Sequence, residues 1–185
     1  MNNRLSQIQH AVDTLILMFI LLFISVFLDA RLIFIDTIPT GGDTASWYQI
    51  ATYLKDHLIP CGRLYGWDMG NFCGYPNFNF YFIPPFLFPV LLSYVGLPLT
   101  IGLKLSMASG WYILPLSVYF GLRLMSYRFP APILGAAAML LFLFNESYTM
   151  FGGNILSTLA GEFCYMFAFS LLPYFMGSMI NGFST

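Results

Sequence analysis

Charged side chains are scarce in this chain. Only 8% of its 185 residues are Asp, Glu, Lys or Arg, whereas 58% are hydrophobic, and the mean hydropathy is +0.75. A soluble domain carries roughly 25% charged residues, so this composition excludes an ordinary water-soluble fold. The formal net charge of −1 also leaves no basic surface of the kind that binds nucleic acid. The composition therefore predicts an integral membrane protein without a nucleic-acid partner.

Histidine and cysteine are also rare, which limits the metal chemistry open to the chain. The two histidines are His10 and His57, and because no CxxC pair occurs, a zinc site is not expected. Cys61 and Cys73 lie in one polar segment, where they either form a disulfide in an oxidising compartment or remain unpaired thiols. The P-loop, GxGxxG, HExxH and GxSxG motifs are absent, so none of the enzyme classes that they mark is indicated.

Long apolar runs take the place of charge in this sequence. The first of them, residues 14–28, is longer than the core of a signal peptide and has no small-residue cleavage site after it, which favours an uncleaved signal-anchor helix. A run of about 20 residues is enough to cross a bilayer. We therefore predict an all-α membrane protein with about four transmembrane helices, at residues 12–35, 99–125, 129–145 and 163–181.

Residues 36–98 differ from these runs because they are rich in acids, glycines and prolines. They are predicted to form a long outer loop. Apolar residues recur at helical spacing over residues 44–58, which predicts a juxtamembrane amphipathic helix lying on the membrane surface, with Asp43 or Thr44 as its N-cap. The residues of this apolar stripe are Trp47, Ile50, Ala51 and Leu54.

Residues 80–97 are apolar but contain three prolines, which break the backbone hydrogen bonding of a helix. Two interpretations follow: a broken transmembrane helix, or a Pro-broken hairpin that dips into the membrane and returns. The positive-inside rule favours the hairpin, because Arg123 and Arg128 then lie on the cytoplasmic side with Arg4. In that arrangement the N-terminus is cytoplasmic, the membrane is the plasma (inner) membrane, and the second polar loop, residues 146–162, lies outside with the first.

Two acidic residues are candidates for chemistry. Asp43 follows a glycine pair, where a carboxylate could act as a base or bind a divalent ion; the competing interpretation is a plain helix N-cap, which is favoured about two to one. Glu162 stands at the start of the last apolar run, where a carboxylate is costly and therefore a functional candidate. Its competing interpretation is an acid stabilised in the first turn of a helix. Asp68 and Glu146 are expected to be solvated loop acids.

Three segments carry a resemblance to a known family. They are GGDTASWYQIATYL (residues 41–54), the Trp/Gly and Pro-rich aromatic stretch of residues 65–92, and GGNILSTLAGEF (residues 152–163). Their order resembles the GT-C superfamily of polytopic membrane glycosyltransferases, in which the first helix is followed by a long outer loop with an essential acid near its start. The third segment is especially similar to a group of multispanning proteins labelled 6-pyruvoyl-tetrahydropterin-synthase-related.

The resemblance implies transfer of a sugar from a polyprenyl-phosphate donor to an acceptor at the outer face. Asp43 falls where the family places its catalytic or metal-linked acid, Glu162 is a second catalytic candidate, and a Mg²⁺ or Mn²⁺ ion would neutralise the leaving phosphate. Family catalytic cores carry more helices than 185 residues allow, so we expect either the N-terminal part of a longer protein or an inactive remnant. The alternative is a non-catalytic structural subunit that packs against lipids and other subunits of a membrane complex.

Overall fold

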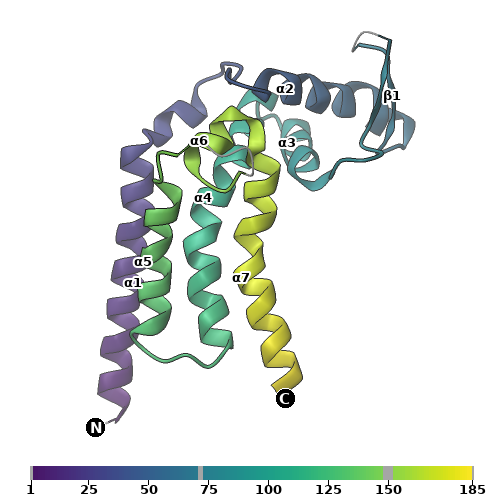
Figure 1. Ribbon diagram of the computed structural model, residues 1–185. Coiled ribbons are helices and arrows are strands. Elements are labelled where there is room, and N and C mark those ends of the chain that lie inside the picture. Colours follow the sequence, from purple (N-terminus) through teal and green to yellow (C-terminus); the bar gives the residue numbers. More distant parts are fainter. Residues whose placement is uncertain (1, 71–72, 148–151, 185) are drawn as a thin grey trace.

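The computed structural model of the protein describes residues 2–70, 73–147 and 152–184. Helices α1 and α5 run toward the same end of a bundle and α4 and α7 run the opposite way, so both chain termini lie at one end of the bundle (Figure 1). The elements in chain order are α1 (Asn2–Phe27), the 3₁₀ helix η1 (Ala30–Phe34), α2 (Thr44–Tyr53), the π-helical η2 (Leu54–Leu58), the 3₁₀ helix η3 (Ile59–Cys61), β1 (Gly66–Asp68), β2 (Tyr75–Asn77), α3 (Pro84–Tyr94), α4 (Leu99–Leu124), α5 (Ala131–Leu143), α6 (Ile155–Ser157), the π-helical η4 (Thr158–Glu162) and α7 (Phe163–Ser184).

Within the described residues, three helices are long and apolar enough to cross a membrane: Gln7–Phe27, Leu99–Leu124 and Ile155–Phe183. The mainly helical architecture expected of a membrane protein is confirmed by this arrangement. Helix α5 is shorter, with 13 residues, which is about 20 Å against a hydrocarbon core of roughly 30 Å. The first helix also ends sooner than predicted, at Phe27. Shortly after it, Asp29 takes a left-handed conformation (φ 45°) and accepts a 2.7 Å hydrogen bond from Arg31.

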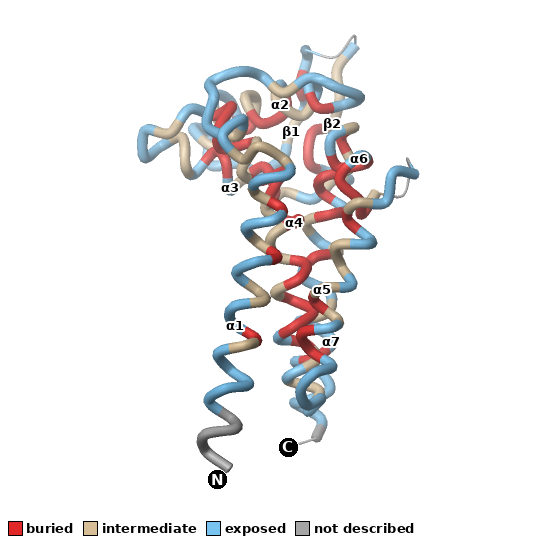
Figure 2. The backbone as a smooth tube through the Cα atoms, turned by 90° about the vertical axis from the view of Figure 1, so that its left-hand side faces the viewer, coloured by how far each residue is buried: buried red, intermediate tan, exposed pale blue. Residues whose placement is uncertain are grey.

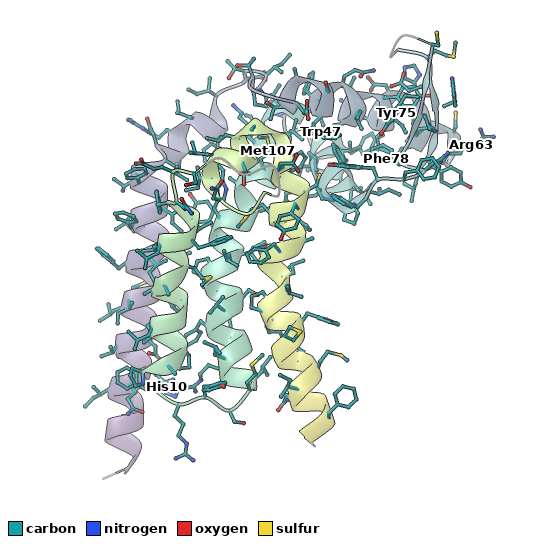
Figure 3. All side chains as sticks on the ribbon, viewed as in Figure 1. His10, Trp47, Arg63, Tyr75, Phe78 and Met107 are labelled. Carbon is teal, nitrogen blue, oxygen red and sulfur yellow. The ribbon has the colours of Figure 1, made fainter. Side chains whose placement is uncertain are left out.

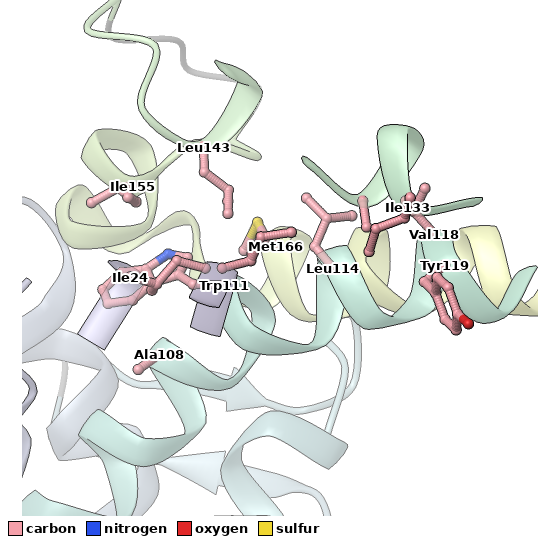
Figure 4. Close-up of a cluster of buried hydrophobic side chains, with 12 residues drawn as sticks. Ile24, Ala108, Trp111, Leu114, Val118, Tyr119, Ile133, Leu143, Ile155 and Met166 are labelled. Atoms are coloured by element: carbon pink, nitrogen blue, oxygen red, sulfur yellow. The ribbon is translucent and has the colours of Figure 1, made fainter. Parts of the chain in front are cut away.

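Helix α4 lies at the centre of the bundle and packs against α1, α3, α5 and α7. Buried apolar side chains of α1, α4, α5, α6 and α7 form one core, which Figure 4 shows around Trp111, Leu114 and Met166. Helices α4 and α7 meet at Gly121 and Gly177, where an added Cβ would overlap backbone atoms of the other helix. Small residues allow this approach, and in lipid such van der Waals contact is a main source of helix association. Figure 2 shows that α1, in contrast, is exposed along most of its length.

The prolines of residues 80–97 start a helix rather than break one. Pro84 and Pro85 occupy the first turn of α3, where a missing N–H costs nothing because those groups have no partner within a helix. Pro89 lies inside α3 and cannot donate to the carbonyl of Pro85. That carbonyl instead accepts a 2.6 Å hydrogen bond from the Ser106 hydroxyl of α4. Helix α4 therefore supplies the hydrogen bond that the proline removes.

The apolar stripe predicted for residues 44–58 is present, but it packs against protein. Ile50, Ala51, Leu54 and Leu58 are buried in a second core together with side chains of α3, α4 and α7. Helix α2 crosses the end of the bundle on top of these elements (Figure 1). The stripe therefore faces α3 and not lipid, and the location of α2 at the membrane surface stays a prediction.

The segment of residues 36–98 also contains a short antiparallel hairpin, β1–β2, which the all-α prediction did not include. Asp68, at the end of β1, is only 4% exposed, so the expectation of a solvated loop acid is wrong. Its carboxylate accepts hydrogen bonds from Gln49 Nε2 (3.0 Å), Asn77 Nδ2 (3.0 Å) and the Gly70 N–H (2.8 Å). Burial of this acid is tolerated because each oxygen has a donor, and the acid ties the hairpin to α2.

Replacement of Ser106 tests the hydrogen bond that compensates for Pro89. Ser106→Ala leaves the buried Pro85 carbonyl without this donor, so we expect a loss of about 1–3 kcal/mol in the free energy of unfolding. Reversible unfolding of the purified protein in mixed detergent micelles measures this loss. The matched control is Ser109→Ala on the same helix, which removes only a local bond to the Ser106 carbonyl; equal losses for the two variants would contradict the interpretation.

Candidate functional site

The two polar segments of the chain meet at the end of the bundle away from the termini. The Asp43 N–H donates a 2.9 Å hydrogen bond to the Ala160 carbonyl, and the Trp47 indole N–H donates a 2.9 Å bond to the Gly161 carbonyl. Figure 3 shows Trp47 above the bundle, where α2 crosses the start of α7. These two bonds place Asp43 beside the turn that leads directly into Glu162.

Glycines make this close contact possible. Gly42 has a left-handed conformation (φ 48°), and an added Cβ there would overlap the Ala160 carbonyl oxygen. Gly161 also has a positive φ of 124°, and a Cβ at this position would lie 3.0 Å from both Asp43 Cβ and Trp47 Nε1. Glycine adopts such a conformation without strain. A glycine in each of the two segments therefore allows them to come this close.

The Asp43 carboxylate is exposed and is not used to cap the helix. Asp43 occupies the N-cap position of α2 but makes no capping hydrogen bond with its side chain. The Thr44 hydroxyl instead donates to the Gly41 carbonyl, which closes the preceding turn. The simple N-cap interpretation of this acid therefore does not describe its side chain.

Glu162 is half-buried at the junction of η4 and α7, next to a cluster of aromatic side chains. Trp47 stacks on Tyr81 with ring centroids 4.9 Å apart, and Phe86 and Phe163 lie 5.7 Å and 6.4 Å from Trp47. Burial raises the pKa of the Tyr81 hydroxyl, and the neighbouring Cys164 and the charge of Glu162 raise it further. Tyr81 therefore lies close enough to Cys164 and Glu162 for their charges to act on its hydroxyl.

An apolar cavity of about 220 Å³ lies next to this contact. Gly41 lies between the cavity and the Asp43–Ala160 contact. A Cβ on Gly41 would lie 3.4 Å from the carbonyl oxygen of Leu159, and Leu159 lines the cavity. Lys104 is the polar residue of the lining, and its ammonium group donates a 3.0 Å hydrogen bond to the Leu32 carbonyl. The cavity is lined by Leu28, Leu32, Ile33, Pro39, Lys104, Met107, Ala108, Trp111 and Leu159.

The metal and cysteine chemistry of the described residues is limited. Among them, no group of three or more His, Cys, Asp or Glu side chains could hold a metal ion. A metal at Asp43 would therefore need ligands from a substrate in addition to one or two protein carboxylates. Cys61 and Cys73 are both exposed and are not joined to each other.

One acid that the sequence interpretation did not single out is buried in the bundle. Asp13 of α1 is 3% exposed, and it accepts a 2.9 Å hydrogen bond from the Tyr119 hydroxyl of α4. It lies in the half of α1 nearer the N-terminus, far along the helix from the outer loops. Its position could have been found from helical periodicity, because Asp13 falls on the same face as the buried Ile20 and Ile24.

Comparisons with known proteins identify no relative of this chain. No protein-family model matches it, and neither a curated protein nor a solved structure is significantly similar to it. The arguments about function below therefore depend on the residues and the geometry described above.

Substitution of Gly42 tests the contact between the two polar segments. Gly42→Ala adds strain at a left-handed position and also a clash with the Ala160 carbonyl. Overpacking of this kind typically costs about 1–3 kcal/mol, so we expect a clear loss in the free energy of unfolding, measured in detergent micelles.

The chain provides a matched control for the strain term alone. Gly62 is also left-handed (φ 68°), but a Cβ there has no atom within 4 Å. Gly62→Ala should therefore lose only the strain energy, on the order of 1 kcal/mol. A loss for Gly42→Ala no larger than that for Gly62→Ala would show that the contact does not stabilise the protein.

Proposed function

We propose that this chain is a GT-C-like membrane glycosyltransferase, or the N-terminal portion of one, which transfers a sugar from a polyprenyl-phosphate donor at the outer face. The observation that carries the proposal is the hydrogen bond from the Asp43 N–H to the Ala160 carbonyl. It joins two polar segments that are more than 100 residues apart and brings together the parts of the chain that hold Asp43 and Glu162. Two acids on segments that are joined beside an apolar cavity suit a reaction between a lipid-linked donor and a polar acceptor.

The proposed chemistry is an inverting transfer with Glu162 as the general base. Glu162 takes the proton from an acceptor hydroxyl while the acceptor oxygen attacks the anomeric carbon of the donor sugar. The bond between that carbon and the phosphate oxygen breaks, and the polyprenyl phosphate leaves with the electron pair. The half-buried position of Glu162 beside Tyr81 supports this role, because a base works best where water is partly excluded.

Asp43 is the residue that we propose to hold a divalent cation. Mg²⁺ is commonly bound by one or two carboxylates together with substrate phosphates and water, so the exposed Asp43 carboxylate fits a Mg²⁺ or Mn²⁺ ion without a larger protein cluster. When bound, such an ion would supply positive charge to the leaving phosphate. Asp43 would then act in the reaction by orienting the phosphate end of the donor.

The apolar cavity beside Asp43 is the proposed place for the first part of the polyprenyl chain. Its lining is almost entirely apolar, and it opens between η1, α4 and η4, where Leu32, Met107 and Leu159 meet. An acyl or prenyl chain gains free energy by leaving water for such a surface.

We also propose that four helices cross the plasma (inner) membrane, with α5 as the fourth and the N-terminus in the cytoplasm. Helix α5 runs beside α1 and α4 (Figure 1). The turn between α4 and α5 carries Arg128 and follows Arg123, and it lies at the same end as the N-terminus. Positive charges at that end favour a cytoplasmic location. Both acids would then face the outer side.

Labelling with a membrane-impermeant maleimide tests this topology. In a background without the three natural cysteines, Ser147→Cys should react in intact cells, whereas Ser126→Cys should react only after the membrane is opened. Both serines are exposed in the structure, so burial does not decide the result. Reaction of both positions from the same side would contradict a fourth crossing by α5.

Conservative substitution of the two acids tests the reaction. Asp43→Asn and Glu162→Gln should each lower sugar transfer by about 10²–10⁴-fold, which is the usual contribution of a positioned acid or base. The measurement is transfer of a radiolabelled hexose from its polyprenyl phosphate to acceptors in membranes of the native host. Matched controls are Asp56→Asn and Glu146→Gln, which remove exposed acids of the same outer loops and should leave transfer unchanged.

Unchanged transfer and unchanged glycan profiles in the Asp43 and Glu162 variants would overturn the proposal. That result would favour the alternative of a structural subunit in a larger membrane complex. The many exposed large apolar side chains of α1 and α7, such as Phe19, Val26 and Phe175, would then be surfaces for other subunits as well as lipid.

A further inference from the structure

A groove of about 460 Å³ lies on the segment of residues 36–98, which we call the outer unit. It shares no lining residue with the apolar cavity and does not include the Asp43–Ala160 contact. Its volume falls within the range of roughly 300–1,000 Å³ that is typical of small-ligand sites. The groove is formed where the second half of α2 and the start of η2 face the β1–β2 hairpin. It is lined by Gln49, Thr52, Tyr53, His57, Trp67, Asp68, Met69 and Gly70.

Trp67 provides a fixed aromatic surface in this groove. One side of its indole rests directly on Gly74, where an added Cβ would overlap the ring. Its backbone carbonyl accepts a 2.6 Å hydrogen bond from the Tyr53 hydroxyl. Although it is held in this way, Trp67 is 57% exposed, so much of the ring is open to a ligand. A large aromatic ring that is ordered before binding loses little conformational entropy on contact.

The floor of the groove holds polar groups in fixed positions. Asp68 is buried and is oriented by Gln49 Nε2 and by the Gly70 N–H. Gly70 keeps the floor open, because a Cβ there would lie 2.9 Å from Gln49 Nε2 and 3.0 Å from Asp68 Oδ1. Gln49 is itself exposed, and its amide offers both donors and an acceptor. The exposed Gln49 amide, oriented by the buried Asp68, can hydrogen-bond hydroxyl groups next to the aromatic face.

The charge of the groove restricts the ligand class. Its lining contains an aspartate but no lysine or arginine, so phosphates and other anions are disfavoured there. Neutral polyhydroxyl molecules suit the site, because the C–H faces of a sugar ring pack on an aromatic ring while its hydroxyls bond to the exposed Gln49 amide. We infer that this groove binds a neutral oligosaccharide.

The position of the groove relates it to the acids. Gln49 lies six residues after Asp43 along the same helical segment, which corresponds to about 9 Å. A glycan held over Trp67 and extending along α2 would therefore reach toward the carboxylates. If the bound oligosaccharide is the acceptor of the sugar, the inference rests on the proposed function. Binding of the oligosaccharide itself does not depend on sugar transfer.

Binding of neutral hexasaccharides tests the assignment. The full chain is reconstituted in lipid nanodiscs, which avoids detergents with sugar head groups, and is titrated by calorimetry with cellohexaose, chitohexaose and mannohexaose. At least one of these should bind saturably, and Trp67→Ala should weaken that binding at least about tenfold. Trp67→Phe, which keeps an aromatic ring, should retain part of the affinity.

Two further variants make the result specific. Phe80→Ala removes another exposed aromatic ring of the outer unit, 89% exposed and outside the groove, and should bind as the wild type does. Asp56→Asn should also keep full binding, because Asp56 is exposed and outside the groove. Binding is measured without a sugar donor, so a failure of the transferase proposal leaves this result separate. Absence of saturable binding for all three hexasaccharides, or wild-type affinity in Trp67→Ala, would overturn the inference.

Discussion

The need to satisfy backbone hydrogen bonds without water governs how this chain is assembled. Pro89 of α3 and Pro173 of α7 each remove a backbone donor inside a continuous helix, and in an apolar environment each freed backbone group costs several kcal/mol. The Ser106 hydroxyl of α4 donates to the Pro85 carbonyl, and Ser117 of α4 accepts from the Tyr174 N–H just after Pro173. Glycines of the same helix allow α3 and α7 to approach closely enough for these bonds. Helix α4 is therefore both the packing centre and the source of compensating polar groups.

The outer unit depends on the same principle at a smaller scale. Two hydrogen bonds, from the Asp43 N–H and the Trp47 indole to the carbonyls of residues 160 and 161, connect α2 to the start of α7. Both fall at glycines with positive φ, where the backbones come too close for any side chain. The contact holds Asp43 next to the segment that ends in Glu162, and the transferase proposal depends on this juxtaposition. The groove at Trp67 is lined by other residues, so the two features can be tested independently.

Buried acids have two different settings in this protein. Asp68 is held by three donors and shapes the groove floor, whereas Asp13 is buried between α1 and α4 with the Tyr119 hydroxyl as its partner. The sequence did not distinguish them from solvated acids, because their donors come from distant residues. The exposed Asp43 shows the reverse case: its helix-start position predicted a cap, but Thr44 and the glycine turn already satisfy the local backbone.

By itself, the sequence determined the helical membrane class, because long apolar runs with 8% charged residues leave few other folds. It also determined the amphipathic stripe of α2 and the choice of Asp43 and Glu162 as candidates, since periodicity and placement next to apolar runs are local properties. Only the tertiary structure decided that this stripe is buried against α3, that Pro84 and Pro85 begin a helix, and that the two outer segments are joined at Gly42 and Gly161. These features arise from contacts between residues far apart in the chain, and local pattern carries no information about such partners.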